Sequence, residues 1–312
     1  MREEIKFKKS GFKPLVCTAI FSLLFGFSFA QKEVDFQFNL EKGMCFEVQT
    51  SSTSNGTHST GGKEQENTSE TNMVFQYQVV KKTPTFYVLN FMYTDYYFKA
   101  MMGEREIIAN PKKADKLNIL DGSTQIAMMM NKPFYAELSP KGKVLAVKEN
   151  KEIEKEFKAK TKNLSPALRE QVYMMVATSK SEALIKNIEI WTSYMPASAV
   201  KIGDKWRIQK DSTYTTDYTF VAETDSTYVI EGVGNSKIIT TNEIQKGMVM
   251  IMTNETEFTI TIEVDKQTFL PKIITQEMEI LGKAEIPNFP NFPQSSNKSY
   301  GTLITEIRSC NQ

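Results

Sequence analysis

The chain has 312 residues, with 38 Lys and Arg against 37 Asp and Glu, so its net charge at neutral pH is close to zero. This balance gives no electrostatic reason for binding nucleic acid or anionic lipid. Three cysteines are too few for a disulfide scaffold. The single histidine, His58, falls in a polar segment, which argues against a Ser-His-Asp triad or a histidine metal site, and we expect no cofactor.

Residues 1–30 have the parts of a secretory signal peptide. A basic segment precedes an apolar run over residues 15–27, which is too short to span about 30 Å of hydrocarbon. Ser28 and Ala30 place small side chains where signal peptidase reads the chain. We therefore expect cleavage after Ala30, a mature chain that starts at Gln31, and a location in the periplasm or outside the cell. No later apolar run reaches the roughly 18 residues of a spanning helix, so we expect no transmembrane segment in the mature chain.

The next part of the chain, up to residue 148, is typical of antiparallel β-structure. Its β-rich runs cover residues 44–49, 73–80, 85–102, 134–138 and 144–148. Between the first two runs, residues 50–72 carry no apolar side chain and contain three glycines. This segment is expected to be either a flexible tip or a long polar hairpin that projects from the sheet.

Residues 149–195 form the one segment with a helical pattern. A charged stretch is followed by Ser165 and Pro166, which suit the N-cap and first position of a helix. Ser179 and Glu182 have the spacing of a capping box that could restart the helix. We expect this segment to pack on the sheet as a helical connector.

The last part, residues 196–312, returns to a β pattern, with runs at 205–208, 214–222, 228–233, 248–264, 270–280 and 300–307. The clearest alternation lies between residues 248 and 264, where apolar side chains alternate with Thr and Glu. Burying that face would contribute on the order of 10 to 20 kcal/mol. It must therefore be covered by the helices, the other half of the chain, a partner or an apolar ligand. The candidate ligand face consists of Met248, Met250, Met252, Phe258, Ile260 and Ile262.

A weak internal duplication organises the β-runs into two lobes. In each lobe a turn glycine, Gly43 or Gly203, leads into a first strand, and two further strand-turn-strand units follow in the same order. We therefore predict a mainly β (α+β) protein. It comprises two antiparallel β-sheet lobes, residues 31–148 and 196–312, joined by the helical connector 149–195.

Two cysteines remain after the signal peptide, Cys45 and Cys310, near opposite ends of the mature chain. Export would deliver them to an oxidising space. They could pair as a disulfide only if the first and last strands are neighbours, which the sequence leaves open.

Two motifs resemble a known family. After the signal peptide comes Phe38-Asn39-Leu40-Glu41-Lys42-Gly43, and much later Lys201-Ile202-Gly203-Asp204-Lys205-Trp206. This arrangement resembles a family of exported bacterial proteins known only as domain of unknown function 6263. The resemblance implies an envelope protein of a Gram-negative cell and supplies no functional residues.

Three functions are compatible with the sequence. The first is a noncatalytic periplasmic protein that binds an apolar small molecule, or a segment of an envelope protein, on a curved β-sheet. The second is a structural or interaction module of the cell envelope. The third is a carboxylate-based hydrolase that uses pairs such as Glu255 and Glu257, which share the wet face of one strand.

Overall fold

The computed structural model describes residues 32–115, 119–210, 213–245, 248–287, 289 and 294–310. The predicted signal peptide lies outside these residues. Residues 33–312 form one unit.

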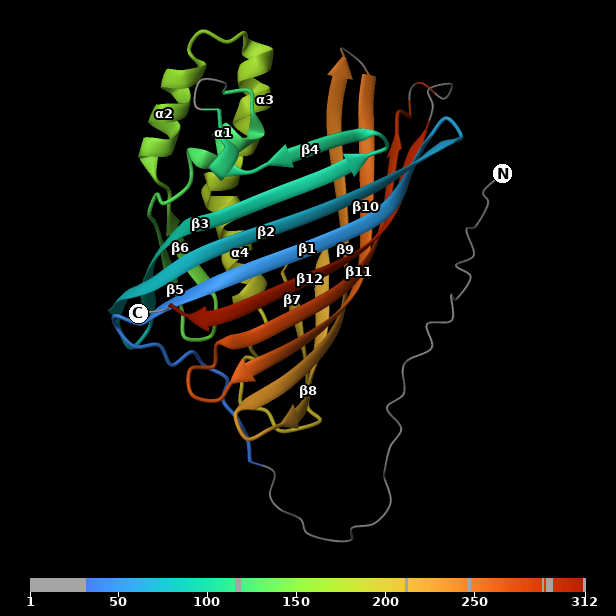
Figure 1. Cartoon of the computed structure of the whole chain (residues 1–312). Helices are drawn as coiled ribbons and strands as arrows, with labels where there is room; N and C mark the ends of the chain where they lie inside the picture. The colour runs from blue at the N-terminus through green and yellow to red at the C-terminus, as the bar shows by residue number, and fades with distance from the viewer. Residues whose placement is uncertain are drawn as a thin grey trace. The chain divides into compact units, whose positions relative to one another are not determined.

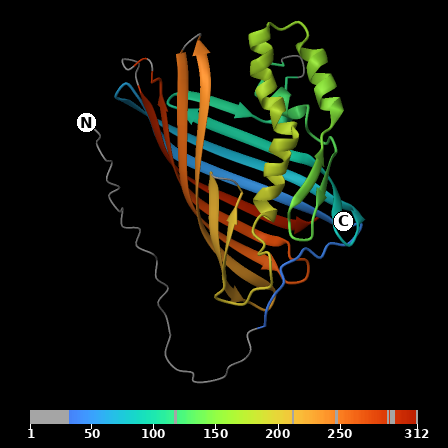
Figure 2. The same ribbon diagram turned by 180° about the vertical axis from the view of Figure 1, so that it is seen from behind.

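Twelve strands make one antiparallel sheet in the order β6-β5-β3-β2-β1-β12-β11-β10-β9-β8-β7, with β4 paired to the second half of β3. The strands are β1 (Cys45–Thr60), β2 (Lys63–Lys82), β3 (Tyr87–Met102), β4 (Arg105–Ala109), β5 (Phe134–Leu138), β6 (Val144–Lys148), β7 (Lys205–Gln209), β8 (Tyr214–Glu223), β9 (Thr227–Gln245), β10 (Met248–Asp265), β11 (Pro271–Glu285) and β12 (Ser295–Ser309). The sheet is strongly twisted and curls around the helices on one of its faces (Figures 1 and 2). We call this the inner face.

The helices are short. They comprise α1 (Gly122–Ala127), α2 (Lys151–Thr161), α3 (Pro166–Val176) and α4 (Ser181–Thr192), with 3₁₀ turns η1 (Pro111–Lys113) and η2 (Ala177–Ser179). None of the helices in the described ranges is long and apolar enough to cross a membrane.

The predicted mainly β class is confirmed, and the two predicted lobes are the two halves of a single continuous sheet. The halves meet where β1 pairs with β12 in an antiparallel ladder. Cys45 and Cys310 lie at the end of this ladder, with 5.4 Å between their Cα atoms, and they form a disulfide. The domain boundaries at residues 148 and 196 stay a prediction, because a continuous sheet does not itself define separate domains.

Local geometry repeats at the turns that the predicted duplication aligns. Gly43 and Gly203 both have positive φ, and each precedes a strand. The N–H of Gly43 donates to the carbonyl of Val79, and that of Gly203 donates to the carbonyl of Phe220, at 2.8 and 2.7 Å. Both acceptors adjoin a register shift, one in the pairing of β2 with β3 and one in that of β8 with β9. The shared geometry supports the duplication, which remains a prediction about origin.

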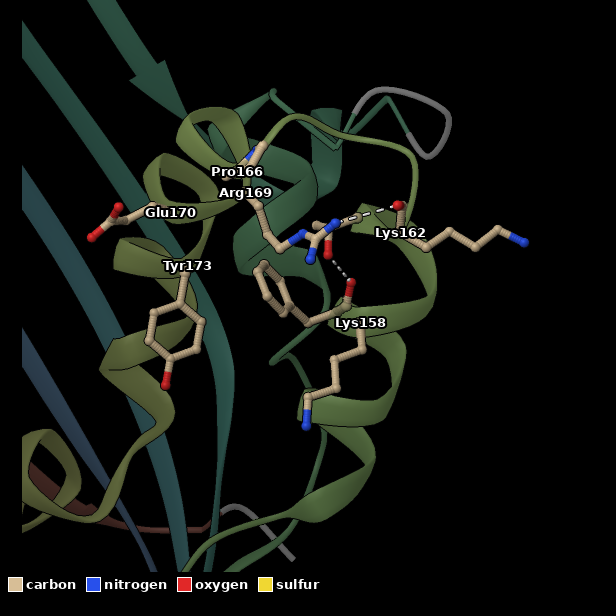
Figure 3. Close-up of a pocket in the computed structure, with 8 residues that line it drawn as sticks. Lys158, Lys162, Pro166, Arg169, Glu170 and Tyr173 are labelled. Carbon is tan, nitrogen blue, oxygen red and sulfur yellow. Dashed lines mark hydrogen bonds between the residues drawn. The ribbon is translucent and has the colours of Figure 1, made fainter.

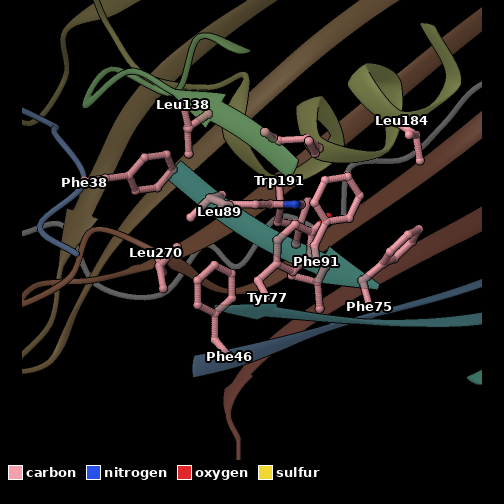
Figure 4. Close-up of a cluster of buried hydrophobic side chains, with 14 of the residues drawn as sticks. Phe38, Phe46, Phe75, Tyr77, Leu89, Phe91, Leu138, Leu184, Trp191 and Leu270 are labelled. Atoms are coloured by element: carbon pink, nitrogen blue, oxygen red, sulfur yellow. The ribbon is translucent and has the colours of Figure 1, made fainter. Parts of the chain in front are cut away.

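Helix α4 covers part of the inner face, and Trp191 is the largest of its buried side chains. Trp191 is fully buried, and its ring lies 5.4 to 5.8 Å from those of Phe38, Phe46 and Tyr77 (Figure 4). Phe46 and Tyr77 are cross-strand partners on β1 and β2 and stack face to face. Such aromatic contacts contribute beyond the area they bury, so this cluster is the centre of the core.

Residues 33–44 form a strap that seals one end of the core. Four of its side chains alternate inward and are buried, namely Val34, Phe36, Phe38 and Leu40. The strap is hydrogen-bonded to both halves of the sheet. The N–H of Phe38 donates to the carbonyl of Pro140, between β5 and β6, and the N–H of Asn39 donates to the carbonyl of Thr268, between β10 and β11. This period-two pattern is present in the sequence, but the sequence analysis did not assign it.

The start of α4 differs from the predicted capping box at Ser179 and Glu182. The residue before the helix is Lys180, and the group that caps the first turn is the carboxylate of Glu149. Its Oε1 accepts from the backbone N–H and the hydroxyl of Ser181, at 2.8 and 2.9 Å. A cap supplied from another segment leaves no local sequence signal.

Residues 50–72 adopt the hairpin alternative. They extend β1 and β2 in register to a turn at Gly61 and Gly62, which both have positive φ as a tight hairpin turn requires. His58 therefore lies on a strand of the sheet and not in a loop.

Candidate functional site

The inner face of the sheet continues well beyond the part that α4 covers. Five rows of side chains cross β10, β11, β12, β1 and β2, each row made of directly paired residues on this face. From the core outward, these inner rows are Ile262-Ile274-Thr305-Thr50-Met73, Ile260-Gln276-Leu303-Ser52-Thr71, Phe258-Met278-Gly301-Ser54-Ser69, Thr256-Ile280-Ser299-Gly56-Asn67 and Asn254-Gly282-Asn297-His58-Gln65. The close approach of Ser299 to Gly56 and of Met278 to Gly301 agrees with this alignment.

The first row belongs to the packed interior. Ile262, Ile274, Thr50 and Thr305 are buried, and the two threonine hydroxyls lie 3.3 Å apart. The next three rows are half-buried apart from the buried residues Ile260, Phe258 and Ser299, and the fifth row has exposed residues at both ends, Asn254 and Gln65.

The candidate ligand face on β10 is split between these environments. Phe258, Ile260 and Ile262 are buried. The Phe258 ring stacks on Tyr214 at 5.5 Å and lies over Gly234 of β9, where a Cβ atom would come within 2.3 Å of the ring. Met248, Met250 and Met252 are half-buried at the far end of the strand. The structure thus brings the three proximal residues together and sets the three methionines apart.

Neighbouring strands supply apolar side chains that the sequence analysis did not select. Met278, Ile280 and Leu303 are half-buried on the inner face, outside the buried core cluster. The pairing of β11 with β12 brings these three residues together, and the pairing of β11 with β10 brings them to Phe258, which is distant in the sequence. Met278 and Ile280 alternate with Glu277 and Glu279 in the predicted β-run 270–280, but only the pairing register shows that they share a face with Leu303 and Phe258.

Aromatic side chains of β3 continue the same face on the other side of β2. Tyr93 is buried, and its hydroxyl accepts a hydrogen bond from the Asn187 amide of α4 at 3.2 Å. Burial raises the pKa of Tyr93 and, to a smaller degree, that of Tyr96. Both phenols therefore stay neutral at physiological pH.

The carboxylates considered for hydrolysis lie elsewhere. Glu255 and Glu257 point to the opposite, outer face of β10, and Glu255 forms an ion pair with Lys237 of β9 at 2.7 Å. Within the residues whose positions are described, no group of three or more His, Cys, Asp and Glu side chains has the arrangement of a metal site.

A separate pocket of about 660 Å³ lies between α2 and α3 (Figure 3). Its wall includes the ring of Phe157 and the cations Lys158, Lys162 and Arg169. Two of these cations have partners, since Lys158 pairs with Glu154 and Arg169 donates to the carbonyls of Lys162 and Leu164. Because Lys158 and Arg169 already have partners within the α2–α3 helix pair, we favour a structural role for this pocket.

Comparison with known proteins identifies a family and no function. The family of unknown function DUF6263 matches residues 84–271. No curated protein matches the chain.

Solved structures align with very low similarity. An outer membrane channel from Pseudomonas putida F1 has 7% identity and a TM-score of 0.20, with 88% of this chain and 98% of that chain covered. The translocator domain of the autotransporter NalP from Neisseria meningitidis has 6% identity and a TM-score of 0.20, with coverage of 86% and 90%. OccAB4 from Acinetobacter baumannii has 7% identity and a TM-score of 0.21, with coverage of 86% and 99%. Similarity at this level supports no functional argument.

Proposed function

The chain belongs to the DUF6263 family, to which no activity is assigned, and we propose that it is an exported, noncatalytic envelope protein that binds an apolar ligand. The ligand lies on the inner face of the curved sheet, beyond the part that α4 fills. The observation that carries this proposal is the half-buried apolar group Met278, Ile280 and Leu303 on a face that curls inward.

The physical reason is the free energy gained when apolar side chains are removed from contact with water. Fully burying a Met, Ile or Leu side chain contributes roughly 1.5 to 3 kcal/mol, and these three side chains realise only part of it. Met250 and Met252 lie farther out on the inner face of β10, beyond Asn254, and Met278 belongs to the apolar group itself; Met side chains adapt to irregular ligands. A ligand that covers this surface would supply the remaining contacts.

Two adjacent residues of β11 offer a matched test. Ile280 faces inward and Leu281 faces outward, and both are half-buried. We expect Ile280→Asp to abolish binding of the neutral fluorescent probe N-phenyl-1-naphthylamine, because a carboxylate in the apolar group must be desolvated. Leu281→Asp should leave binding unchanged.

Native mass spectrometry of protein purified without detergent provides a second measurement. We expect an adduct in the wild type and in Leu281→Asp, and its loss in Ile280→Asp. A wild-type protein that carries no adduct and binds no apolar probe would contradict the proposal.

A further inference from the structure

Over the five rows on β10, β11, β12, β1 and β2, the two faces of the sheet differ in charge; beyond these rows the inner face carries Lys63 on β2 and Arg105 on β4. The five inner rows contain no Asp, Glu, Lys or Arg at any position, although the outer rows are half-exposed. The alternate residues of the same stretches, on the outer face, include seven charged side chains: Glu66, Glu70, Glu255, Glu257, Glu277, Glu279 and Lys298. A surface in contact only with water would be expected to carry charges on both faces, so the neutrality of the inner face calls for an explanation.

The fifth inner row replaces apolar groups with hydrogen-bonding ones, and the next row outward begins again with Met252 on β10. Asn254 and Asn297 reach toward each other over Gly282, where a Cβ atom would lie 1.8 Å from the Asn297 Oδ1 and 2.8 Å from the Asn254 Oδ1. His58 and Gln65 continue the row on β1 and β2. Glycine at position 282 is therefore what allows two amide side chains to occupy adjacent positions.

One atom of this row lacks a hydrogen bond. The Oδ1 of Asn297 is buried and has no partner among the described residues. An unsatisfied buried polar atom is costly, and a hydroxyl group of a ligand at this position would donate the missing hydrogen bond.

The chemistry changes along the strands in the order that an amphiphile would require. The half-buried side chains Leu303, Met278 and Ile280 lie in successive rows, and the amides lie in the next row outward. Successive rows are two residues apart, about 7 Å along a strand. The apolar part and the polar row together are thus long enough for a medium-length alkyl chain and its headgroup.

We propose that the ligand of the inner face is an uncharged amphiphile, with its alkyl chain against Met278 and Ile280 and its hydroxyl-bearing headgroup on the row of Asn254 and Asn297. This inference rests on the proposed function and adds the class of headgroup. An ion placed among the inner rows would find no opposite charge to offset its desolvation. Amide side chains, in contrast, both donate to and accept from neutral hydroxyl groups.

The test compares three ligands that share a dodecyl chain: dodecyl glucoside, laurate and dodecyltrimethylammonium. Each is titrated into the purified protein by calorimetry, below its micelle concentration. We expect dodecyl glucoside to bind at least tenfold more tightly than either charged ligand.

Variants then separate the headgroup from the chain. Asn297→Ala should weaken dodecyl glucoside roughly tenfold, the loss expected for about one hydrogen bond, while leaving the binding of N-phenyl-1-naphthylamine, which has no hydroxyl group, within twofold. Lys298→Ala, the next residue of β12 on the outer face, is the matched control and should change neither affinity. The wild-type comparison of the three ligands does not depend on how well the variants fold.

The outcomes distinguish the two proposals. Equal affinities for all three ligands, or tighter binding of laurate, would overturn the neutral-headgroup inference and leave the apolar binding site intact. Failure of every dodecyl ligand and of N-phenyl-1-naphthylamine to bind would overturn the proposed function and this inference with it.

Discussion

Reduction of the disulfide between Cys45 and Cys310 should destabilise the protein without unfolding it. The bond joins residues separated by 265 positions, nearly the full length of the part that forms the sheet. The chain-entropy relation gives about 5 to 6 kcal/mol for a loop of this length, and measured values for disulfides usually fall below such predictions. We therefore expect the free energy of unfolding to fall by about 3 to 5 kcal/mol.

The ladder between β1 and β12 predicts how the reduced protein behaves. It pairs residues from Phe46 with Ser309 to Thr60 with Ser295, so the sheet should persist without the covalent link. Denaturant unfolding, followed by circular dichroism with and without reductant, measures the loss. Cys45→Ser, Cys310→Ser and the double variant should be equally destabilised, because each removes the same bond. A loss below about 1 kcal/mol would refute the reasoning that the link restrains the unfolded chain.

Four further predictions concern the core, a helix cap, a strand contact and export. Trp191→Ala should lower the free energy of unfolding by about 3 to 5 kcal/mol in denaturant titrations, because the ring is fully buried. Glu149→Gln should cost about 1 kcal/mol near pH 7. The hydrogen bonds from Ser181 lower the pKa of the Glu149 carboxyl. The stabilisation by this carboxylate is therefore fully present above the unfolded pKa and is lost as the pH falls through the lower folded pKa. Urea titrations at pH 7 and pH 3 should show that the difference in unfolding free energy between Glu149→Gln and wild type shrinks at the lower pH. Gly234→Ala should cost about 1 to 3 kcal/mol in thermal unfolding, since its Cβ would displace the Phe258 ring, and an unchanged stability would contradict that contact. Intact mass of the exported protein should correspond to a chain starting at Gln31, and a mass that includes Met1 would contradict cleavage.

The strands with one buried face could be predicted because their pattern is local. Phe258, Ile260 and Ile262 alternate with Thr and Glu, and a period of two has one simple explanation in a pleated strand. The polar stretch 50–72 could not be assigned to one of its two alternatives. Ser, Thr and Asn occur in both loops and strands, so only pairing with β12 and within the hairpin decides that it is sheet.

The candidate site was only partly predictable. The candidate ligand face predicted from the sequence lies on β10 alone, because its residues follow one another in the chain. The inner rows combine segments near residues 55, 70, 255, 280 and 300, and a shift of one residue in any pairing would turn that strand's side chains to the other face.

By itself, the sequence determined that the chain is mainly β and where most of its strands lie, because alternation and turn residues act over a few positions. Only the tertiary structure decided that the two halves form one sheet, that Cys45 meets Cys310, and that Asn254 and Asn297 lie in one row next to Ile280 on the inner face. The physical reason is that strand order and register depend on hydrogen bonds between segments distant in the chain, which no local pattern records.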